Sequence, residues 1–204
     1  MTQQLNYKNL SVAATITTIT GLILLAASFL FNKESFFLLF NHDLGENADA
    51  FFAAFTHLGE TIPWVVALAL ILLFKKDFFW LLLACFFIST LFVQGIKNVL
   101  PEQPRPTKAI TSTFQVHTVK GVELHKEFSF PSGHTATAFT VFFIACLAID
   151  AWWILPVGFA YAFLVGYSRV YLAQHFPRDI AGGMLIAVIT IYLSLWVSKM
   201  RFKE

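Results

Sequence analysis

Two histidines and one aspartate stand where polar segments meet long apolar runs. His134 ends the tetrapeptide Pro-Ser-Gly-His and opens one run, while His175 lies four residues before Asp179 at the start of another. A carboxylate this close can hold an imidazole in one tautomer and stabilise its cation. The supported imidazole suits nucleophilic attack, and the second imidazole suits proton donation to a leaving oxygen. We therefore interpret His175 as a nucleophile, Asp179 as the residue that orients it, and His134 as a proton donor.

Three basic residues accompany these histidines. Lys97 and Arg105 follow one apolar run, and Arg169 follows another. Arg105 lies between two prolines, which restrict the backbone and give its guanidinium a defined direction, and a guanidinium suits bidentate contact with phosphate. Ser132 is the predicted N-cap of the helix that follows it, and Gly133 allows a ligand to approach the backbone. Positive charges beside a helix N-terminus indicate a site for a tetrahedral oxyanion such as phosphate.

Each cluster by itself also has a plainer interpretation. Lys97 can be interpreted as a side chain that reaches from a helix end to the membrane surface. Ser132 can be interpreted as an ordinary helix cap beside an interfacial histidine. The plainer interpretation of Arg169 and Asp179 is an ion pair that the two form with each other at the membrane interface. Ionisable groups at a membrane edge are functional candidates by default, and three such clusters on one face favour a shared site.

The composition places these residues in a membrane protein. Of the 204 residues, 57% are hydrophobic, only 13% are charged, and 24 are phenylalanine, whereas soluble domains have roughly 25% charged residues. A soluble fold of this length has too little interior for so much apolar surface. The length suits a single domain covering residues 1–204. The net charge of +2 is too small to indicate a nucleic-acid partner.

An α-helix needs about 20 apolar residues, with a range of about 17–25, to span a bilayer. Six runs are candidates for such helices: Ser11–Phe31, Thr61–Phe74, Phe78–Ile96, His134–Ile149, Ala151–Tyr167 and Ile180–Met200. The sequence therefore predicts an all-α integral membrane bundle of six transmembrane helices. Before the short second run, the segment Glu46–His57 mixes phenylalanines with polar residues, which predicts a short amphipathic helix on the membrane surface.

The order of the runs places the three clusters on one membrane face. Two crossings separate the polar segment Lys97–Gly133 from the polar segment Ser168–Asp179, so both emerge on the same side. Six crossings place both chain ends on the other side. The two sides carry nearly equal numbers of basic residues once those assigned to the site are set aside, so the positive-inside rule decides little. We expect the ends in the cytoplasm and the site on the outer face, which in a bacterial inner membrane is the periplasmic face.

The remaining reactive side chains show no pattern that indicates a metal or a cofactor. Four further histidines are scattered without metal-ligand spacing: His42, His57, His117 and His125. No acidic pair resembles a two-metal phosphatase, and the sequence has no glycine-rich phosphate loop with a lysine. Cys85 and Cys146 lie inside apolar runs and are interpreted as small hydrophobic residues. We expect a site that works without a metal or a cofactor.

The motifs, in this order, resemble those of the type 2 phosphatidic acid phosphatase (PAP2) superfamily, also called the lipid phosphate phosphatase and haloperoxidase group. The family pattern is Lys-x6-Arg-Pro, then Pro-Ser-Gly-His, then Ser-Arg-x5-His-x3-Asp. The second motif is complete at residues 131–134 and the third at residues 168–179, whereas the first has seven residues rather than six between Lys97 and Arg105. The resemblance covers the chain from about Phe78 to its end.

The resemblance implies a six-helix membrane bundle with a metal-independent phosphohydrolase site. By motif position, His175 would form a phosphohistidine that Asp179 orients, and His134 would protonate the leaving group and then activate water. The phosphoryl oxygens would be held by Lys97, Arg105, Ser132, Gly133 and Arg169.

The activity expected from this site is removal of a terminal phosphate from a membrane lipid. Candidate substrates are undecaprenyl pyrophosphate, phosphatidylglycerophosphate, phosphatidic acid and lipid A phosphates. A lipid phosphotransferase would use the same site with a lipid or sugar acceptor in place of water. A transporter of anions or lipid phosphates is a third interpretation, which a short helix favours but which the clustering of charge at one face and the lack of an inverted repeat in the sequence oppose. The sequence indicates no particular oligomeric state.

Overall fold

A helix forms at each of the six predicted apolar runs. A computed structural model of the chain describes residues 5–101, 103–110 and 116–201. In these ranges every regular element is a helix and no strand occurs, so the prediction of an all-α fold is confirmed. The helices, in chain order, are α1 (Tyr7–Leu30), α2 (Lys33–Leu38), α3 (Glu46–Phe55), the 3-10 helix η1 (Thr56–Gly59), α4 (Ile62–Phe74), the 3-10 helix η2 (Lys76–Phe78), α5 (Phe79–Val99), α6 (Pro106–Ala109), α7 (Gly133–Ala148), α8 (Ile154–Tyr171) and α9 (Pro177–Arg201).

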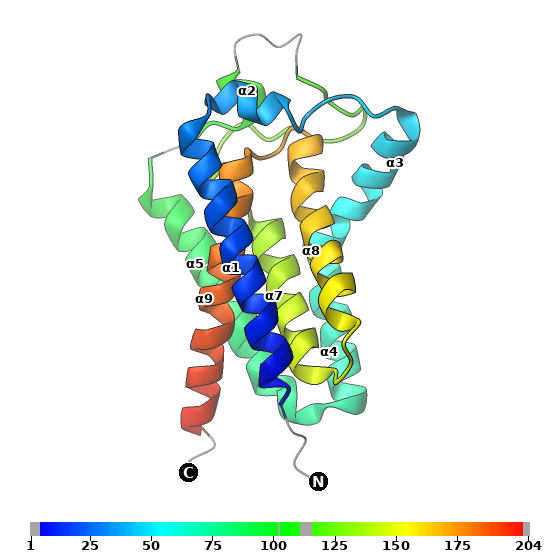
Figure 1. The fold of residues 1–204 in the computed structure, drawn as a ribbon, viewed down its shortest axis with the longest axis vertical. Helices are drawn as coiled ribbons and strands as arrows, with labels where there is room; N and C mark the ends of the chain where they lie inside the picture. Colours follow the sequence, from blue (N-terminus) through cyan, green and yellow to red (C-terminus); the bar gives the residue numbers. More distant parts are fainter. Residues whose placement is uncertain (1–4, 102, 111–115, 202–204) are drawn as a thin grey trace.

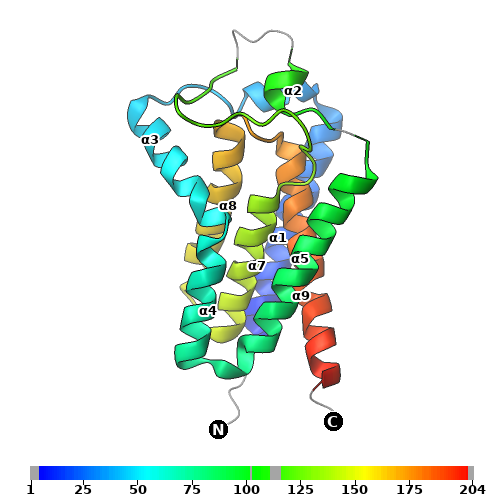
Figure 2. The same ribbon diagram turned by 180° about the vertical axis from the view of Figure 1, so that it is seen from behind.

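The long helices run along the long axis of the molecule, with α7 inside the bundle (Figure 1). α7 packs against α1, α5, α8 and α9. The start of α1 and the end of α9 lie at one end of the bundle. The opposite end carries α2, α6 and the loops around them, together with the turn between α8 and α9 (Figures 1 and 2). The two polar segments thus lie at the same end, as the order of the runs predicts.

Several of these helices are long and apolar enough to cross a membrane. Four segments meet this test singly: Tyr7–Leu30, Lys76–Val99, Ile154–Tyr171 and Pro177–Ser198. The segments Glu46–Gly59 and Ile62–Phe74 meet it only as a pair, and the pair is bent by 52° at the break between them. α7 has only 16 residues, which is just below the usual length of a span. The chain is an integral membrane protein, and the count of six crossings stays a prediction.

The second apolar run and the helix before it are separated by a sharp break. A helix, α3, forms where the sequence predicts the short amphipathic helix, and η1 and a turn at Glu60 and Thr61 link it to α4. Gly59 lies at the break, where a Cβ atom would be only 2.6 Å from Val165 Cγ1 and 2.8 Å from His134 Cβ. Pro63 follows in the first turn of α4, where its missing N–H costs nothing. The break therefore brings residues 56–60 against α7 and α8.

The N-terminal ends of α7 and α9 approach each other closely. Ser132 is the N-cap of α7, as predicted, and its Oγ accepts a hydrogen bond from the Thr135 backbone N–H at 3.3 Å. α9 presents Gly183 to this end of α7, where a Cβ atom would be 2.6 Å from the Ser132 carbonyl oxygen and 2.8 Å from Thr135 Cβ. No side chain fits in this space, so glycine permits the contact between the two helix ends.

The substitution Gly183→Ala tests the importance of this contact. The added methyl group must push α9 away from the backbone of α7, and overpacking of this kind typically costs about 1–3 kcal/mol. We expect a lower midpoint of thermal unfolding in detergent micelles than for the unchanged protein. Gly95→Ala is the matched control: Gly95 is also helical, and an added Cβ there meets no atom within 4 Å. Equal unfolding midpoints for the two variants would contradict the prediction.

Candidate active site

A polar cavity of about 630 Å³ lies between the helices and the loops that cover them. Six of the eight residues predicted for the site line this cavity: Lys97, Arg105, Gly133, His134, Arg169 and His175. The other two, Ser132 and Asp179, are fully buried and contact residues around the cavity. The fold therefore brings together three clusters that are far apart in the sequence.

Asp179 is the buried residue that joins two of these clusters. Its Oδ2 accepts hydrogen bonds from Ser129 Oγ at 2.6 Å and from the Phe176 backbone N–H at 2.9 Å. Asp179 is the third residue of α9, and an acidic residue at this position commonly reaches back to the residue that precedes the helix. Its backbone carbonyl also accepts a hydrogen bond from the Ser132 N–H at 3.0 Å. One residue thus ties the start of α9 to the segment that leads into α7.

His175 lies in the short turn between α8 and α9 and is 1% exposed. Its backbone N–H donates to the Arg169 carbonyl at 3.1 Å, and its Nδ1 lies 3.5 Å from Asp179 Oδ2. Because Nδ1 is on the Asp179 side, Nε2 is the ring nitrogen available to a ligand. Burial lowers the pKa of His175 to about 3, against the opposing charge of Asp179. The ring is therefore neutral near pH 7, which is the form that acts as a nucleophile.

His134 is the second residue of α7, and its ring reaches the break between α3 and α4. His134 Nε2 lies 3.1 Å from Glu60 Oε1. The other carboxylate oxygen, Glu60 Oε2, lies 3.2 Å from His57 Nδ1. The cavity thus contains a second pair of imidazole and carboxylate, formed by His134 and Glu60, in addition to His175 and Asp179.

Arg105 is held in place by uncharged oxygens. Its side chain is nearly buried, and Nε donates to the Glu127 carbonyl at 2.8 Å. Nη1 donates to the carbonyl of Gln174 at 3.1 Å and to its side-chain Oε1 at 3.0 Å. Burial lowers the pKa of Arg105, but an arginine stays charged in proteins. Because its hydrogen-bond partners are neutral, the positive charge of Arg105 remains available to a ligand in the cavity.

Arg169 and Lys97 add positive charge from α8 and α5. Arg169 Nη1 donates to Thr56 Oγ1 at 2.6 Å, whereas its buried Nε has no hydrogen-bond partner among the described residues. A buried donor without an acceptor costs free energy, and an anionic oxygen in the cavity would provide the acceptor. Lys97 and Gly133 line the same cavity. Three cations and the N-terminus of α7 make the cavity suited to an anion with several oxygens.

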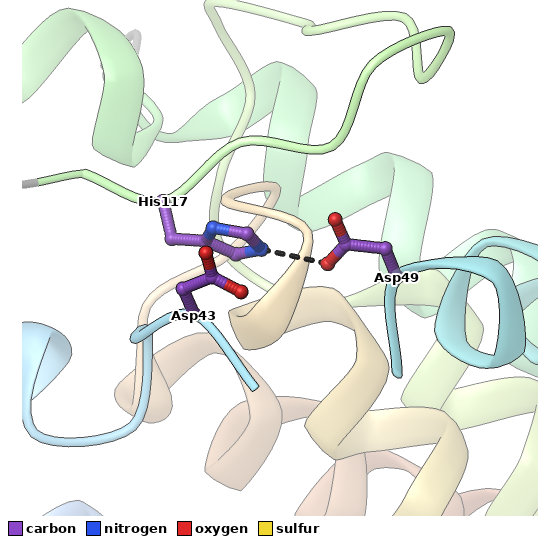
Figure 3. Close-up of side chains that lie close together, drawn as sticks. All are labelled: Asp43, Asp49 and His117. Carbon is purple, nitrogen blue, oxygen red and sulfur yellow. Dashed lines mark hydrogen bonds and ion pairs between the residues drawn. The ribbon is translucent and has the colours of Figure 1, made fainter. Parts of the chain in front are cut away.

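A separate group of ligating side chains joins α3 to α8. Asp43, Asp49 and His117 each place one ligating atom within 4.8 Å of the others (Figure 3). His117 Nε2 lies 2.9 Å from Asp49 Oδ1, and the Tyr171 hydroxyl donates to the same oxygen at 2.6 Å. These hydrogen bonds give the group internal partners, so we assign it a structural role. The expectation that the site uses no metal stays a prediction.

One wall of the cavity was not predicted from the sequence. Thr56, His57 and Glu60 line it from the break between α3 and α4, and Gln174 lines it from the turn before His175. In the sequence, His57 shows no metal-ligand spacing and was given no role in the site, and Glu60 was not singled out. A usable pattern was present: two ionisable residues stand three positions apart on either side of Gly59, directly before an apolar run that is short for a span.

Comparisons with known proteins find relatives that cover most of the chain. An undecaprenyl-diphosphatase of Sulfolobus acidocaldarius is 27% identical over 169 residues, which are 82% of this chain and 78% of that protein. The crystal structure of LpxE from Aquifex aeolicus is 32% identical and has a TM-score of 0.68, covering 78% of this chain and 92% of that chain. A PAP2-type phosphatidylglycerolphosphate phosphatase from Bacillus subtilis shares the fold at 23% identity, with a TM-score of 0.64 over 92% of this chain and 96% of that chain.

The family assignment rests on the C-terminal part of the chain. Residues 78–203 match the family model of the PAP2 superfamily, which is more than half of the 204 residues. This range holds α5 to α9 and all three motifs on which the resemblance was based. The resemblance is confirmed, and the chain belongs to the PAP2 superfamily.

Proposed function

We propose that this protein is a phosphatase that removes phosphate from membrane lipids through a covalent phosphohistidine at His175. The observation that carries the proposal is the single cavity in which a buried, neutral His175 and the ring of His134 meet three basic side chains. Membership of the PAP2 superfamily and the phosphatase names of its relatives support it. The assigned roles of the individual residues follow from their geometry.

In the first step, His175 Nε2 attacks the phosphorus atom, and the bond between phosphorus and the lipid oxygen breaks. The leaving oxygen takes a proton from His134, so a monoester leaves as the lipid alcohol. Asp179 stabilises the positive charge that develops on the attacking ring. The charge on the phosphoryl oxygens is balanced by the cavity's basic residues and by the start of α7, namely Lys97, Arg105, Arg169 and Gly133, while Ser132 supports this helix end as its cap.

In the second step, water releases the phosphate. His134 is now neutral and takes a proton from the water molecule whose oxygen attacks the phosphorus. The bond between phosphorus and His175 breaks, and inorganic phosphate forms. His175 regains its lone pair and His134 its proton, so the enzyme returns to its starting state. These steps require neither a metal nor a cofactor.

An apolar groove next to the cavity supports a substrate with a long chain. The groove has a volume of about 480 Å³, is lined by α4, α7 and α8, and reaches from Leu58 in η1 along α4 to Phe74. Leu58 is only two residues from Glu60, which lines the polar cavity. A phosphate head in the cavity and an apolar chain along the groove therefore fit the protein together. We propose a lipid monophosphate or diphosphate as the substrate. The names of two relatives, an undecaprenyl-diphosphatase and a phosphatidylglycerolphosphate phosphatase, refer to lipids of these two kinds.

For the orientation, we propose that both chain ends lie in the cytoplasm and that the cavity opens to the outer face. In a bacterial inner membrane this is the periplasmic face. We also propose that residues 1–204 act as one domain, because α1 packs against α7 and α9 of the family region.

The variant His175→Ala tests the proposed nucleophile. Without it the phosphohistidine cannot form, and we expect turnover to fall by at least about 10³-fold. The measurement is release of inorganic phosphate in detergent from phosphatidic acid, phosphatidylglycerophosphate and a polyprenyl diphosphate. His42→Ala, which removes an exposed histidine outside the cavity lining, is the matched control. Full activity of His175→Ala refutes the nucleophile, and phosphate found on an added lipid or sugar acceptor instead of in solution argues for a transferase.

Removal of divalent cations tests the proposed chemistry in a different way. Because the cavity holds three basic side chains for the phosphoryl oxygens, we expect phosphate release to continue at the same rate in millimolar chelator. A loss of activity that added divalent cations restore would contradict this expectation.

The buried state of His175 predicts a dependence of stability on pH. Its folded pKa of about 3 lies below its unfolded value near 6.5, so between pH 7 and pH 5 the unfolded chain gains a proton that the folded protein does not. The free energy of unfolding should therefore fall on acidification, and this residue alone should contribute about 2 kcal/mol of the loss. Thermal unfolding in detergent should show a smaller loss between pH 7 and pH 5 for His175→Gln than for the unchanged protein. An equal loss would indicate that His175 is not neutral in the folded state.

A further inference from the structure

The partly exposed carboxylate of Glu60 lines a cavity that is otherwise suited to anions. Glu60 comes from the break between α3 and α4, before the region that matches the family model. Its two oxygens have separate partners: Oε1 lies 3.1 Å from His134 Nε2, and Oε2 lies 3.2 Å from His57 Nδ1. Glu60 is thus fixed by one histidine while it contacts another that the proposed mechanism uses.

The groups around His134 determine how readily its ring carries a positive charge. The ring of His134 faces Arg169 from α8, His175 from the following turn, and Glu60. Burial and the charge of Arg169 disfavour the charged form of this ring, whereas the Glu60 carboxylate favours it. The proposed first step needs His134 in its charged form, because the neutral ring has no proton to spare for the leaving oxygen. Glu60 is the acidic group in contact with this ring, and its negative charge offsets the repulsion between Arg169 and the charged ring.

The local backbone also keeps Glu60 in place. Gly59 allows η1 to lie directly against His134, since a side chain there would overlap Val165 and His134. The Tyr161 hydroxyl donates to the Leu58 carbonyl at 2.7 Å, and Arg169 donates to Thr56 Oγ1. The residues on the N-terminal side of Glu60 are therefore attached to α8, next to the cavity.

We propose that Glu60 is a positioning residue for the phosphatase reaction: held by His57, it accepts a hydrogen bond from Nε2 of His134 and stabilises the charged ring until the leaving oxygen of the substrate takes the proton on Nδ1. The inference rests on the proposed function of the protein. The carboxylate does not touch the phosphorus atom and acts only through His134. When water later returns a proton to His134, Glu60 stabilises the charged ring again.

This role makes the effect of Glu60 depend on the leaving group. A lipid monoester must release an alcohol, and an alkoxide without a proton is a very poor leaving group. A lipid diphosphate releases a lipid monophosphate instead, whose second pKa is about 6, so it can depart without receiving a proton. Loss of the Glu60 charge should therefore slow cleavage of a monoester much more than cleavage of a diphosphate. A purely structural residue would affect both substrates equally.

The test is the variant Glu60→Gln, which keeps the size and hydrogen-bonding oxygen of the side chain but removes its charge. We expect kcat/KM to fall at least tenfold more for phosphatidic acid than for a polyprenyl diphosphate, since a general acid typically contributes about 10²–10⁴-fold. Inhibition by inorganic phosphate should stay as strong as in the unchanged protein, because the basic residues of the cavity are intact. Glu46→Gln removes the same charge at the far end of α3, outside the cavity lining, and should change neither substrate.

The possible results separate the inference from the proposed function. Equal losses on both substrates, or no loss on either, would refute the role of Glu60 while leaving the phosphatase activity in place. Weaker inhibition by inorganic phosphate together with equal losses would show that Glu60 supports the fold of the cavity instead. An unchanged protein that releases phosphate from neither lipid would refute the proposed function, and the role of Glu60 with it.

Discussion

The arrangement of the site depends on the burial of one carboxylate. A buried charge is costly unless donors surround it, and Asp179 Oδ2 obtains them from Ser129 and from the backbone of Phe176, while Nδ1 of His175 lies 3.5 Å from the same oxygen. Meeting this requirement closes the turn after α8 and draws the segment before α7 toward α9. The same contacts that satisfy the carboxylate set the position of the ring that we propose as the nucleophile.

The two arginines of the cavity keep their positive charge available because their hydrogen-bond partners are neutral. Arg105 is oriented by carbonyl and amide oxygens, and Arg169 is oriented by a threonine hydroxyl. Neutral acceptors fix the direction of a guanidinium without cancelling its charge, which a carboxylate partner would do. The close approach of α9 at Gly183 fixes the N-terminal end of α7 beside these cations. This helix end adds to the positive potential of the cavity.

Much of this structure is predictable from sequence because the bilayer and the motifs constrain it strongly. Apolar length predicts the helices, and the order of crossings brings Lys97, His134 and His175 to one end. The part contributed by Glu60 depends on packing instead: its contact with His134 requires the bend at Gly59, which comes from the fit of η1 against α7 and α8. The spacing of His57 and Glu60 around Gly59 marks this segment as a candidate, but it does not predict the contact with His134, which depends on that fit.

The break between α3 and α4 divides the cavity between two parts of the chain. The groups proposed to act on phosphorus lie within residues 78–203, whereas the wall at residues 56–60 lies outside this range. Substitutions in that wall can therefore alter the surroundings of the leaving group of the substrate. The residues proposed to attack the phosphorus atom and to bind the phosphoryl oxygens stay unchanged. A protein built in this way can acquire new lipid preferences by changes to residues 1–77 alone, without renewed selection on its reaction chemistry.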